Sequence, residues 1–497
     1  MTFEDKKLFK DVAKVAAVLV VALFACRVSK GYFSVIMAGM GVWWAFTQKF
    51  GKSLSCFAYF PLLIVVDPGV LPKTAILGMV LRVAPLLIGV ALFIMANSRH
   101  GVNRLPLGGL FLYLLVSVIS SMGGWSPLIS YMKMLNFVLF IVGIWLGTQN
   151  LQDRPQDIYL ERISFLAMVC IVVFGSVLTI PFPRISYSTN FMWTAVSSQA
   201  EAAAAIAELE ANAGLALFSG LLNHSQALAP VLSCCIALTL ADMLFIERRG
   251  SWLHISLIVV AMGELYMTRS RTGLFSCSIG LFMVLAHAAK KLSMTPQMRM
   301  RIKRMTSAGL TLLFLAVIAS EITNRTFTRW VYKSNDAFAQ QDVGFDEALT
   351  STRQLLIEQS LEEFRMNPLF GMGFQVNFET EILYGGKGFV LSAPVEKGLL
   401  PTTILGESGI VGSIAFLIFL ISFYSICARK RLHITIAMFT TFLATNIGES
   451  TFFSPGGIGG ILWVFSVVGG FALDTMLLRE QRAVGWRNAN WSYSTYA

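Results

Sequence analysis

The sequence predicts an all-α fold, a polytopic helical membrane protein with about 14 transmembrane helices, each formed by an apolar run of about 20 residues. Charged residues make up 13% of the chain, roughly half of the share of about 25% that soluble domains carry. Hydrophobic residues make up 55%, and the mean hydropathy is +0.67. Apolar runs recur from one end to the other, so we expect no separate soluble domain.

The predicted spans are distributed along the whole chain. They lie near residues 12–26, 31–47, 53–67, 75–96, 107–121, 132–147, 162–181, 215–246, 252–268, 272–289, 306–321, 402–427, 432–447 and 458–477. The first span is as short as the apolar part of a signal peptide. However, no small-residue cleavage site follows it and further spans do, so we expect it to remain as a helix.

The net charge of +11 is explained by where the basic residues lie. Most of them fall in short links between spans, as the positive-inside rule predicts for cytoplasmic loops, so we do not expect nucleic-acid binding. With a cytoplasmic N-terminus, the other cytoplasmic links and the tail contain Lys49, Lys52, Arg99, Arg104, Arg154, Arg162, Arg248, Arg249, Lys290, Arg304, Arg429, Lys430, Arg431, Arg479 and Arg482. Arg27 and Lys30 are exceptions.

This topology predicts two extracytoplasmic loops between three groups of helices. The segments are N-terminal transmembrane helices 1–181, a first loop 182–213, central transmembrane helices 214–321, a large loop 322–400, C-terminal transmembrane helices 401–477 and a cytoplasmic tail 478–497. The first loop contains AEAAAAIAELEANA, an Ala- and Glu-rich stretch that predicts a short helix. All seven cysteines lie in apolar spans without a CxxC pattern, which indicates packing residues.

The large loop contains an amphipathic segment, TSTRQLLIEQSLEEFRMNP. Ile357, Leu361 and Phe364 give it one apolar face, which predicts a helix. The helix should end at Asn367-Pro368, because the residue before a proline is disfavoured in helical geometry. Gly371 and Gly373 then predict a tight turn.

Arg269 and Arg271 lie at the predicted outer end of one span and the start of the next, in MTRSRTGLF. Arginine is disfavoured on this side of the membrane and at a membrane edge usually faces a cavity or a partner. Two planar guanidinium groups match the oxygens of a pyrophosphate. The alternative is a pair of arginines that extend to lipid headgroups.

Further polar residues at the outer face are candidates for substrate contact. His224 precedes a span and can equally cap a helix or bond between helices. Arg353 lies near the start of the loop helix, Glu396 and Lys397 precede another span, and Glu407 lies in its first turns. A partly buried carboxylate there can act as a general base. Otherwise Glu396 and Lys397 form an exposed ion pair, and Glu407 a hydrogen bond between helices.

No motif for nucleotide or metal chemistry is present. The sequence has no Walker A motif, no HExxH and no Cys/His set with metal spacing. We therefore predict no metal and no cofactor, and we expect an enzyme of this kind to meet its substrates at the outer membrane face.

Four stretches together resemble the O-antigen ligase and O-antigen polymerase superfamily of bacterial membrane glycosyltransferases. In chain order they are FSGLLNHSQALAP, TRSRTG, STRQLLIEQSLEEFRMNPLFGMGF and LLPTTILGESGIVG. The most specific part is the NPLFGMGF turn followed by GESGIVG. The resemblance covers roughly residues 214–470, whereas the N-terminal part is similar only in hydropathy.

The resemblance implies a multi-helix fold in the bacterial cytoplasmic (inner) membrane with one large extracytoplasmic loop. It implies metal-independent transfer of a glycan from an undecaprenyl-pyrophosphate carrier to a sugar hydroxyl. In that family arginines hold the donor pyrophosphate, a role that the resemblance gives to Arg271 and also to Arg269 and Arg353.

The chain departs from the family pattern at two places. Ligases of the family carry a histidine near the position of Gly398, where this chain reads VEKGLL. Either Glu396 is then the base, or the acceptor is activated differently. An arginine often seen before the FSG stretch is also absent, and Arg184 of the first loop can replace it. Both departures favour an exopolysaccharide-type polymerase over a lipid A ligase.

Three functions remain open from the sequence. The leading hypothesis is a polymerase that joins lipid-linked repeat units to a growing polysaccharide, in contact with membrane lipid and with a chain-length regulator and a flippase as further partners. The second is a ligase that moves a finished glycan to a lipid or protein acceptor. The third, of another class, is a flippase or transporter of lipid-linked oligosaccharides, which should have related halves and helices broken near the membrane midplane.

Overall fold

The computed structural model describes the chain in separate stretches. They comprise residues 3–29, 35–36, 39, 43, 106–148, 155–181, 187–188, 217–222, 225–247, 251–291, 345–376, 398–448, 450–455 and 458–481. The predicted spans near 31–47, 53–67, 75–96 and 306–321 lie wholly or largely outside these residues, as does the predicted helix in the first loop. Nearly all of the described secondary structure is helical, as predicted.

Each described helix except α16 coincides with a predicted span. The helices are α1 (Phe3–Val28), α5 (Gly108–Met122), α6 (Pro127–Gly147), α7 (Pro155–Thr179), α10 (Ser225–Asp242), the π-helix η2 (Met243–Glu247), α11 (Trp252–Met267), α12 (Arg271–Lys291), α16 (Phe345–Met366), α18 (Leu400–Arg429), α19 (His433–Thr445), α20 (Ile458–Trp463) and the π-helix η3 (Val464–Gly469), after which the helix continues to residue 481. The described residues also contain two short strands, β1 (Tyr187–Ser188) and β2 (Leu217–Phe218), which pair in antiparallel orientation.

Within the described residues, six helical segments are long and apolar enough to cross a membrane. They are Pro127–Trp145, Tyr159–Thr179, Ser225–Glu247, Arg271–Ala289, Leu400–Arg429 and Ile458–Gln481, while α5, α11 and α19 are shorter apolar helices. These segments indicate a membrane protein. The predicted span 215–246 starts too early, because β2 and a turn at Gly220, with φ of 56°, precede α10.

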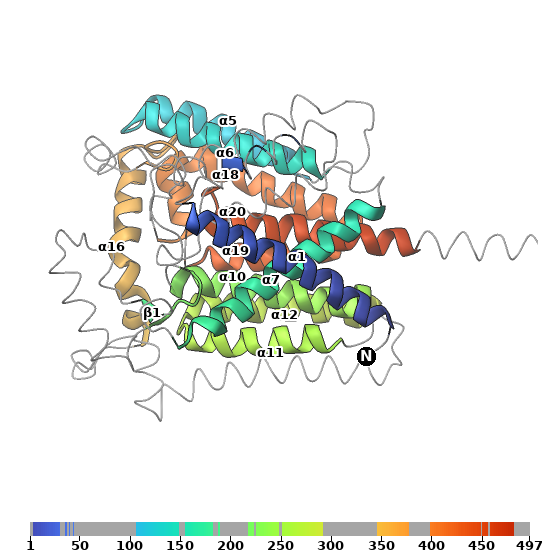
Figure 1. The fold of residues 1–497 in the computed structure, drawn as a ribbon. Helices are drawn as coiled ribbons and strands as arrows, with labels where there is room; N and C mark the ends of the chain where they lie inside the picture. Colours follow the sequence, from blue (N-terminus) through green and yellow to red (C-terminus); the bar gives the residue numbers. More distant parts are fainter. Residues whose placement is uncertain are drawn as a thin grey trace, which may run out of the picture.

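The loop helix predicted from its apolar periodicity is α16, which ends at Met366 just before Asn367-Pro368, as expected. It lies across one end of the bundle, whereas the other helices run side by side away from it (Figure 1). We call this the α16 end. The starts of α10, α12 and α18 and the ends of α11 and α19 lie here, because the short links make successive helices antiparallel.

Aromatic rings fill the core between α5, α6, α18, α19 and α20. Trp463 is fully buried, and its ring centroid lies 4.9 Å from that of Phe452 and 5.4 Å from that of Phe442. Its indole N–H donates to the Phe452 carbonyl at 2.8 Å. This packing holds the segment after α19 against the bundle, close to the α16 end.

Candidate functional site at the α16 end

The turn NPLFGMGF fits into a break in helix α18. At Gly409 the backbone leaves helical geometry, with φ of 62° and ψ of −162°, a combination that is essentially restricted to glycine. The amides after the break are bonded to the turn: Ile410 N donates to Pro368 O at 2.9 Å and Val411 N to Leu369 O at 3.2 Å. The turn therefore satisfies backbone groups that the broken helix leaves open.

The two glycines of the turn have the conformations predicted for them, with φ of 70° at Gly371 and 109° at Gly373. Gly371 also allows the turn to approach α18 closely, since a Cβ at this position would collide with the backbone of Glu407 and Ser408. Next to it, Met372 N donates to Gly406 O at 2.9 Å and Gly373 N to Glu407 O at 3.0 Å. The turn and the first part of α18 thus form one backbone-bonded unit.

The other side of the turn is held by α5, α6 and their link. Trp125 N donates to Met372 O at 3.1 Å, and Ser130 Oγ donates to Phe374 O at 2.9 Å. Lys133 Nζ donates to the Gln375 carbonyl at 3.0 Å. Lys133 is a charged residue inside an apolar helix and is only 3% exposed. It joins α6 to the turn by a charge-assisted hydrogen bond, the stronger kind.

Glu407 lies in the last helical turn before the break and is fully buried. Its Oε1 accepts a hydrogen bond from Gln375 Nε2 at 3.2 Å, and its carbonyl oxygen accepts one from the Ser120 hydroxyl. These contacts match the packing alternative expected from the sequence. Glu407 thus connects α18 to the turn through its side chain and to α5 through its carbonyl group.

Arg269 and Arg271 occupy the tight turn between α11 and α12, and both are half-buried. Arg269 has a φ of 51°, which is uncommon for a residue other than glycine. The Ser270 hydroxyl accepts from Gly273 N at 3.2 Å and so caps α12, which begins at Arg271. Two arginine residues therefore lie at the positive end of a helix dipole, where an anion is favoured.

The segment after α19 connects the turn that contains Arg269 and Arg271 to the start of α18. Gly448 lies so close to Thr272 at the start of α12 that a Cβ would collide with the threonine side chain. Asn446, two residues earlier, accepts from Leu400 N at 3.0 Å, at the start of α18. The structure thereby brings Arg269, Arg271 and Glu407 to the same end of the bundle.

The remaining predicted site residues lie outside this description. Arg184, His224, Glu396 and Lys397 are not among the described residues. Arg353 lies in α16, although its side chain is not described. Their proposed roles therefore stay predictions.

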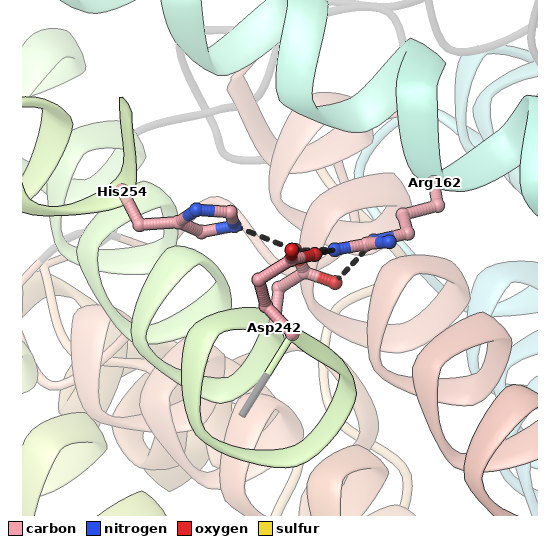
Figure 2. A network of polar contacts seen from close by, with 4 residues as sticks. Arg162, Asp242 and His254 are labelled. Atoms are coloured by element: carbon pink, nitrogen blue, oxygen red, sulfur yellow. Dashed lines mark hydrogen bonds and ion pairs between the residues drawn. The ribbon is translucent and has the colours of Figure 1, made fainter. Parts of the chain in front are cut away.

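A second polar cluster lies at the opposite end of the bundle, where α7, α10 and α11 meet (Figure 2). Arg162 binds Asp242 through two hydrogen bonds, of 2.7 and 2.9 Å, and Glu247 through a third of 2.7 Å. His254 Nε2 contacts the same Asp242 carboxylate at 2.7 Å. We call these residues the Arg162 network. Because the arginine is bonded to two carboxylates inside the protein, the arrangement is suited to holding helices together.

Sequence reasoning missed the roles of Lys133 and Asp242. Each is a charged residue inside an otherwise apolar run, and such residues are rare enough in membrane helices to mark a partner or a site. That pattern was available in the sequence, whereas the identity of each partner required the fold.

A scan against protein-family models finds no match, and a search of curated protein sequences also finds none.

Proposed function

We propose that the chain is a membrane glycosyltransferase that polymerises undecaprenyl-pyrophosphate-linked oligosaccharide units at the outer face of the bacterial cytoplasmic membrane. The observation that carries the proposal is the pair Arg269 and Arg271 at the start of α12. It is supported by the loop helix α16 and the glycine turn at the same end of the bundle, and by the resemblance of these motifs to the O-antigen ligase and polymerase superfamily.

In this mechanism Arg269 and Arg271 bind the pyrophosphate of the donor. A hydroxyl of the acceptor sugar attacks the anomeric carbon, forming the new glycosidic bond while the bond to the pyrophosphate oxygen breaks. The two arginines and the positive end of α12 stabilise the negative charge that develops on the leaving pyrophosphate. The hydroxyl proton passes to a base, for which Glu396 is the candidate from the sequence.

The central test replaces Arg271 with alanine and with lysine. Arg271→Ala should abolish long polymer in cells while the protein still reaches the membrane, and Arg271→Lys should retain part of the activity because it keeps the charge but loses the bidentate fork. Polysaccharide length on gels and the amount of protein in the membrane are the two readouts. Normal chain length in Arg271→Ala would contradict the proposal.

Arg365→Ala is the matched control. Arg365 lies at the same end of the bundle in the last turn of α16, and its side chain is exposed. If general positive charge at this end were sufficient for donor binding, both substitutions would shorten the polymer equally. We expect Arg365→Ala to leave polymer length unchanged.

The accumulated product separates polymerase from ligase. A polymerase variant leaves products with one repeat unit, whereas a ligase variant accumulates polymer on the lipid carrier. The ligase reading thus predicts a different product from the same Arg271→Ala strain.

A flippase or transporter of lipid-linked oligosaccharides is the second candidate function. It is favoured by the break in α18 at Gly409, since transporters use interrupted helices at their binding sites. The break follows the first turns of α18 at the α16 end, whereas transporter sites lie near the midplane, and this position supports the glycosyltransferase. Carrier-linked single units retained on the cytoplasmic side of an Arg271→Ala strain would favour the transporter.

A further inference from the structure

Glu264 is a buried carboxylic acid inside the helix bundle that has no part in the proposed transfer reaction. It lies in α11 and is 2% exposed, and neither of its carboxyl oxygens has a hydrogen-bond partner among the residues that the structure describes. An isolated carboxylate in such surroundings costs several kcal/mol or more, unless a proton or a cation neutralises it.

A thiol of a neighbouring helix lies near Glu264. Cys235 of α10 interacts electrostatically with Glu264 and, in turn, with Cys170 of α7. The two residues of β2, which also packs against α11, are apolar. Thiols are largely uncharged at neutral pH, so they cannot neutralise a carboxylate.

A proton is a better candidate than a metal ion for neutralising the Glu264 carboxylate. Among the described residues, no group of three or more His, Cys, Asp and Glu side chains is arranged to hold one. The basic Arg269 and Arg271 lie beyond the end of α11, in the turn that leads to α12. A proton is therefore the simplest partner for Glu264.

Three other buried polar atoms of α10 and α11 also lack a hydrogen-bond partner among the described residues. They are Ser225 Oγ at the start of α10, Thr239 Oγ1 near its end, and His254 Nδ1 near the start of α11. Buried polar groups are almost always hydrogen-bonded, and where the protein offers no partner, ordered water usually does.

We call the contact between α10 and α11 that contains Asp242, His254, Cys235 and Glu264 the seam. At about 100° per residue, Ser225, Thr239 and Asp242 fall within an arc of about 100° on α10, and His254 and Glu264 fall within about 80° on α11. The two faces meet where His254 contacts Asp242 and again where Cys235 faces Glu264. With a rise of about 1.5 Å per residue, Glu264 lies about 15 Å along α11 from His254.

At the end of this seam, His254 is already fixed by the Arg162 network. Its Nε2 contacts Asp242 at 2.7 Å, and Figure 2 shows the other ring nitrogen on the far side of the ring from that carboxylate. This second nitrogen, which is buried and without a protein partner, is a place where a water molecule can exchange a proton with the seam.

We propose that Glu264 is a proton-binding site, reached by water along the seam between α10 and α11. A proton carried by this water binds the Glu264 carboxylate to give the neutral acid, and its return to water restores the charge, so the step needs no further reactant. The site is independent of the proposed glycosyl transfer. A proton-coupled movement of lipid-linked substrate would use it if the chain is a transporter.

Infrared spectroscopy of the purified full chain in detergent tests the protonation. The neutral acid should give an infrared band from the carbonyl stretch of a protonated carboxyl group. This band should be absent from the spectrum of Glu264→Gln. Asp474 is the internal control, because its buried carboxylate accepts bonds from Ile434 N, Thr435 N and the Thr435 hydroxyl at 2.7–3.1 Å and should stay charged. Asp474→Asn should leave the band unchanged. A spectrum in which Glu264→Gln removes no such band would overturn the proposal.

Transfer to D2O tests the path. The Glu264 band should shift within the time of buffer exchange, and Thr239→Val should slow the shift at least several-fold, because it removes a hydroxyl that holds water in the seam. Thr475→Val is the matched control, since the Thr475 hydroxyl donates to Phe471 O at 2.8 Å away from the seam. Two results would contradict the water path. One is a Glu264 band that does not shift in D2O while the protein stays folded, and the other is a band that shifts as fast in Thr239→Val as in the unchanged protein.

Discussion

The two ends of the helix bundle use arginine in opposite ways. At the end away from α16, Arg162 is 8% exposed in its side chain and is bonded to the carboxylates of Asp242 and Glu247. At the α16 end, Arg269 and Arg271 are half-buried in a tight turn where a helix begins. The first arrangement places positive charge among negative charges from the same chain, whereas the second places it at the positive end of a helix.

The two arrangements differ in where the arginines lie within the helices. A buried ion pair that is well bonded costs desolvation and holds its helices in register, and it attracts no anion from outside because its charge is already balanced. Arginines at a helix N-terminus add to the positive potential of the dipole, so an anionic ligand gains from both. Residue type alone therefore does not predict the role of an arginine, and its place in the fold has to be known as well.

The first prediction concerns the removal of the positive charge from the Arg162 network. Arg162→Met should lower the free energy of unfolding by about 3–5 kcal/mol, because it leaves the carboxylate of Asp242 buried without its cation. Thermal unfolding in detergent measures the loss. Lys14→Met is the matched control: Lys14 pairs with Asp11 at 3.9 Å on the surface, and its removal should leave the melting temperature unchanged.

A second substitution sharpens the test of balance. Arg162→Met combined with Asp242→Leu removes both charges of the main pair and should recover part of the lost stability. If the double variant were as unstable as the sum of its two single changes, charge balance would not be the reason for the network.

The second prediction disturbs the α16 end without touching an arginine. Gly409→Ala should lower stability by about 1–3 kcal/mol, because an L-residue resists this backbone conformation and its Cβ would collide with the Leu369 carbonyl. In the proposed enzyme, polymer length should fall as well, since the glycine turn is displaced. Gly263→Ala, where a Cβ meets open space on α11, is the control: it should not lower stability, because alanine favours a helix more than glycine does, and it should leave polymer length unchanged. Full activity in a stable Gly409→Ala variant would show that the inserted turn is not needed at the site.

The sequence predicts the scaffold of this end well. Periodicity identifies α16, the Asn367-Pro368 pair predicts its end, and Gly371 and Gly373 mark the turn that follows. These features are local, because each depends on residues close together in the chain. The apolar runs likewise locate every other described helix, with errors of several residues where caps are weak.

The break in α18 and the Arg162 network were not predicted. Gly409 lies in an apolar helical pattern, and its conformation follows from the turn that inserts beside it, which comes from residues about 40 positions earlier. Arg162 and Asp242 are likewise 80 residues apart, so their pairing depends on how α7 packs on α10. For the arginine turn, the sequence predicted the position, whereas the left-handed backbone of Arg269 depends on the tight link between two packed helices.

The last prediction compares two arginines with the same backbone conformation at opposite ends. Arg269 has a φ of 51° between α11 and α12, and Arg431 a φ of 59° between α18 and α19. Glycine adopts this conformation without strain but has more freedom when unfolded, so Arg269→Gly and Arg431→Gly should each change stability by no more than about 1 kcal/mol. Only Arg269→Gly removes a guanidinium from the proposed pyrophosphate site, so it alone should shorten the polymer. Equal shortening by both variants would mean that turn geometry, and not the charge at the start of α12, limits the reaction.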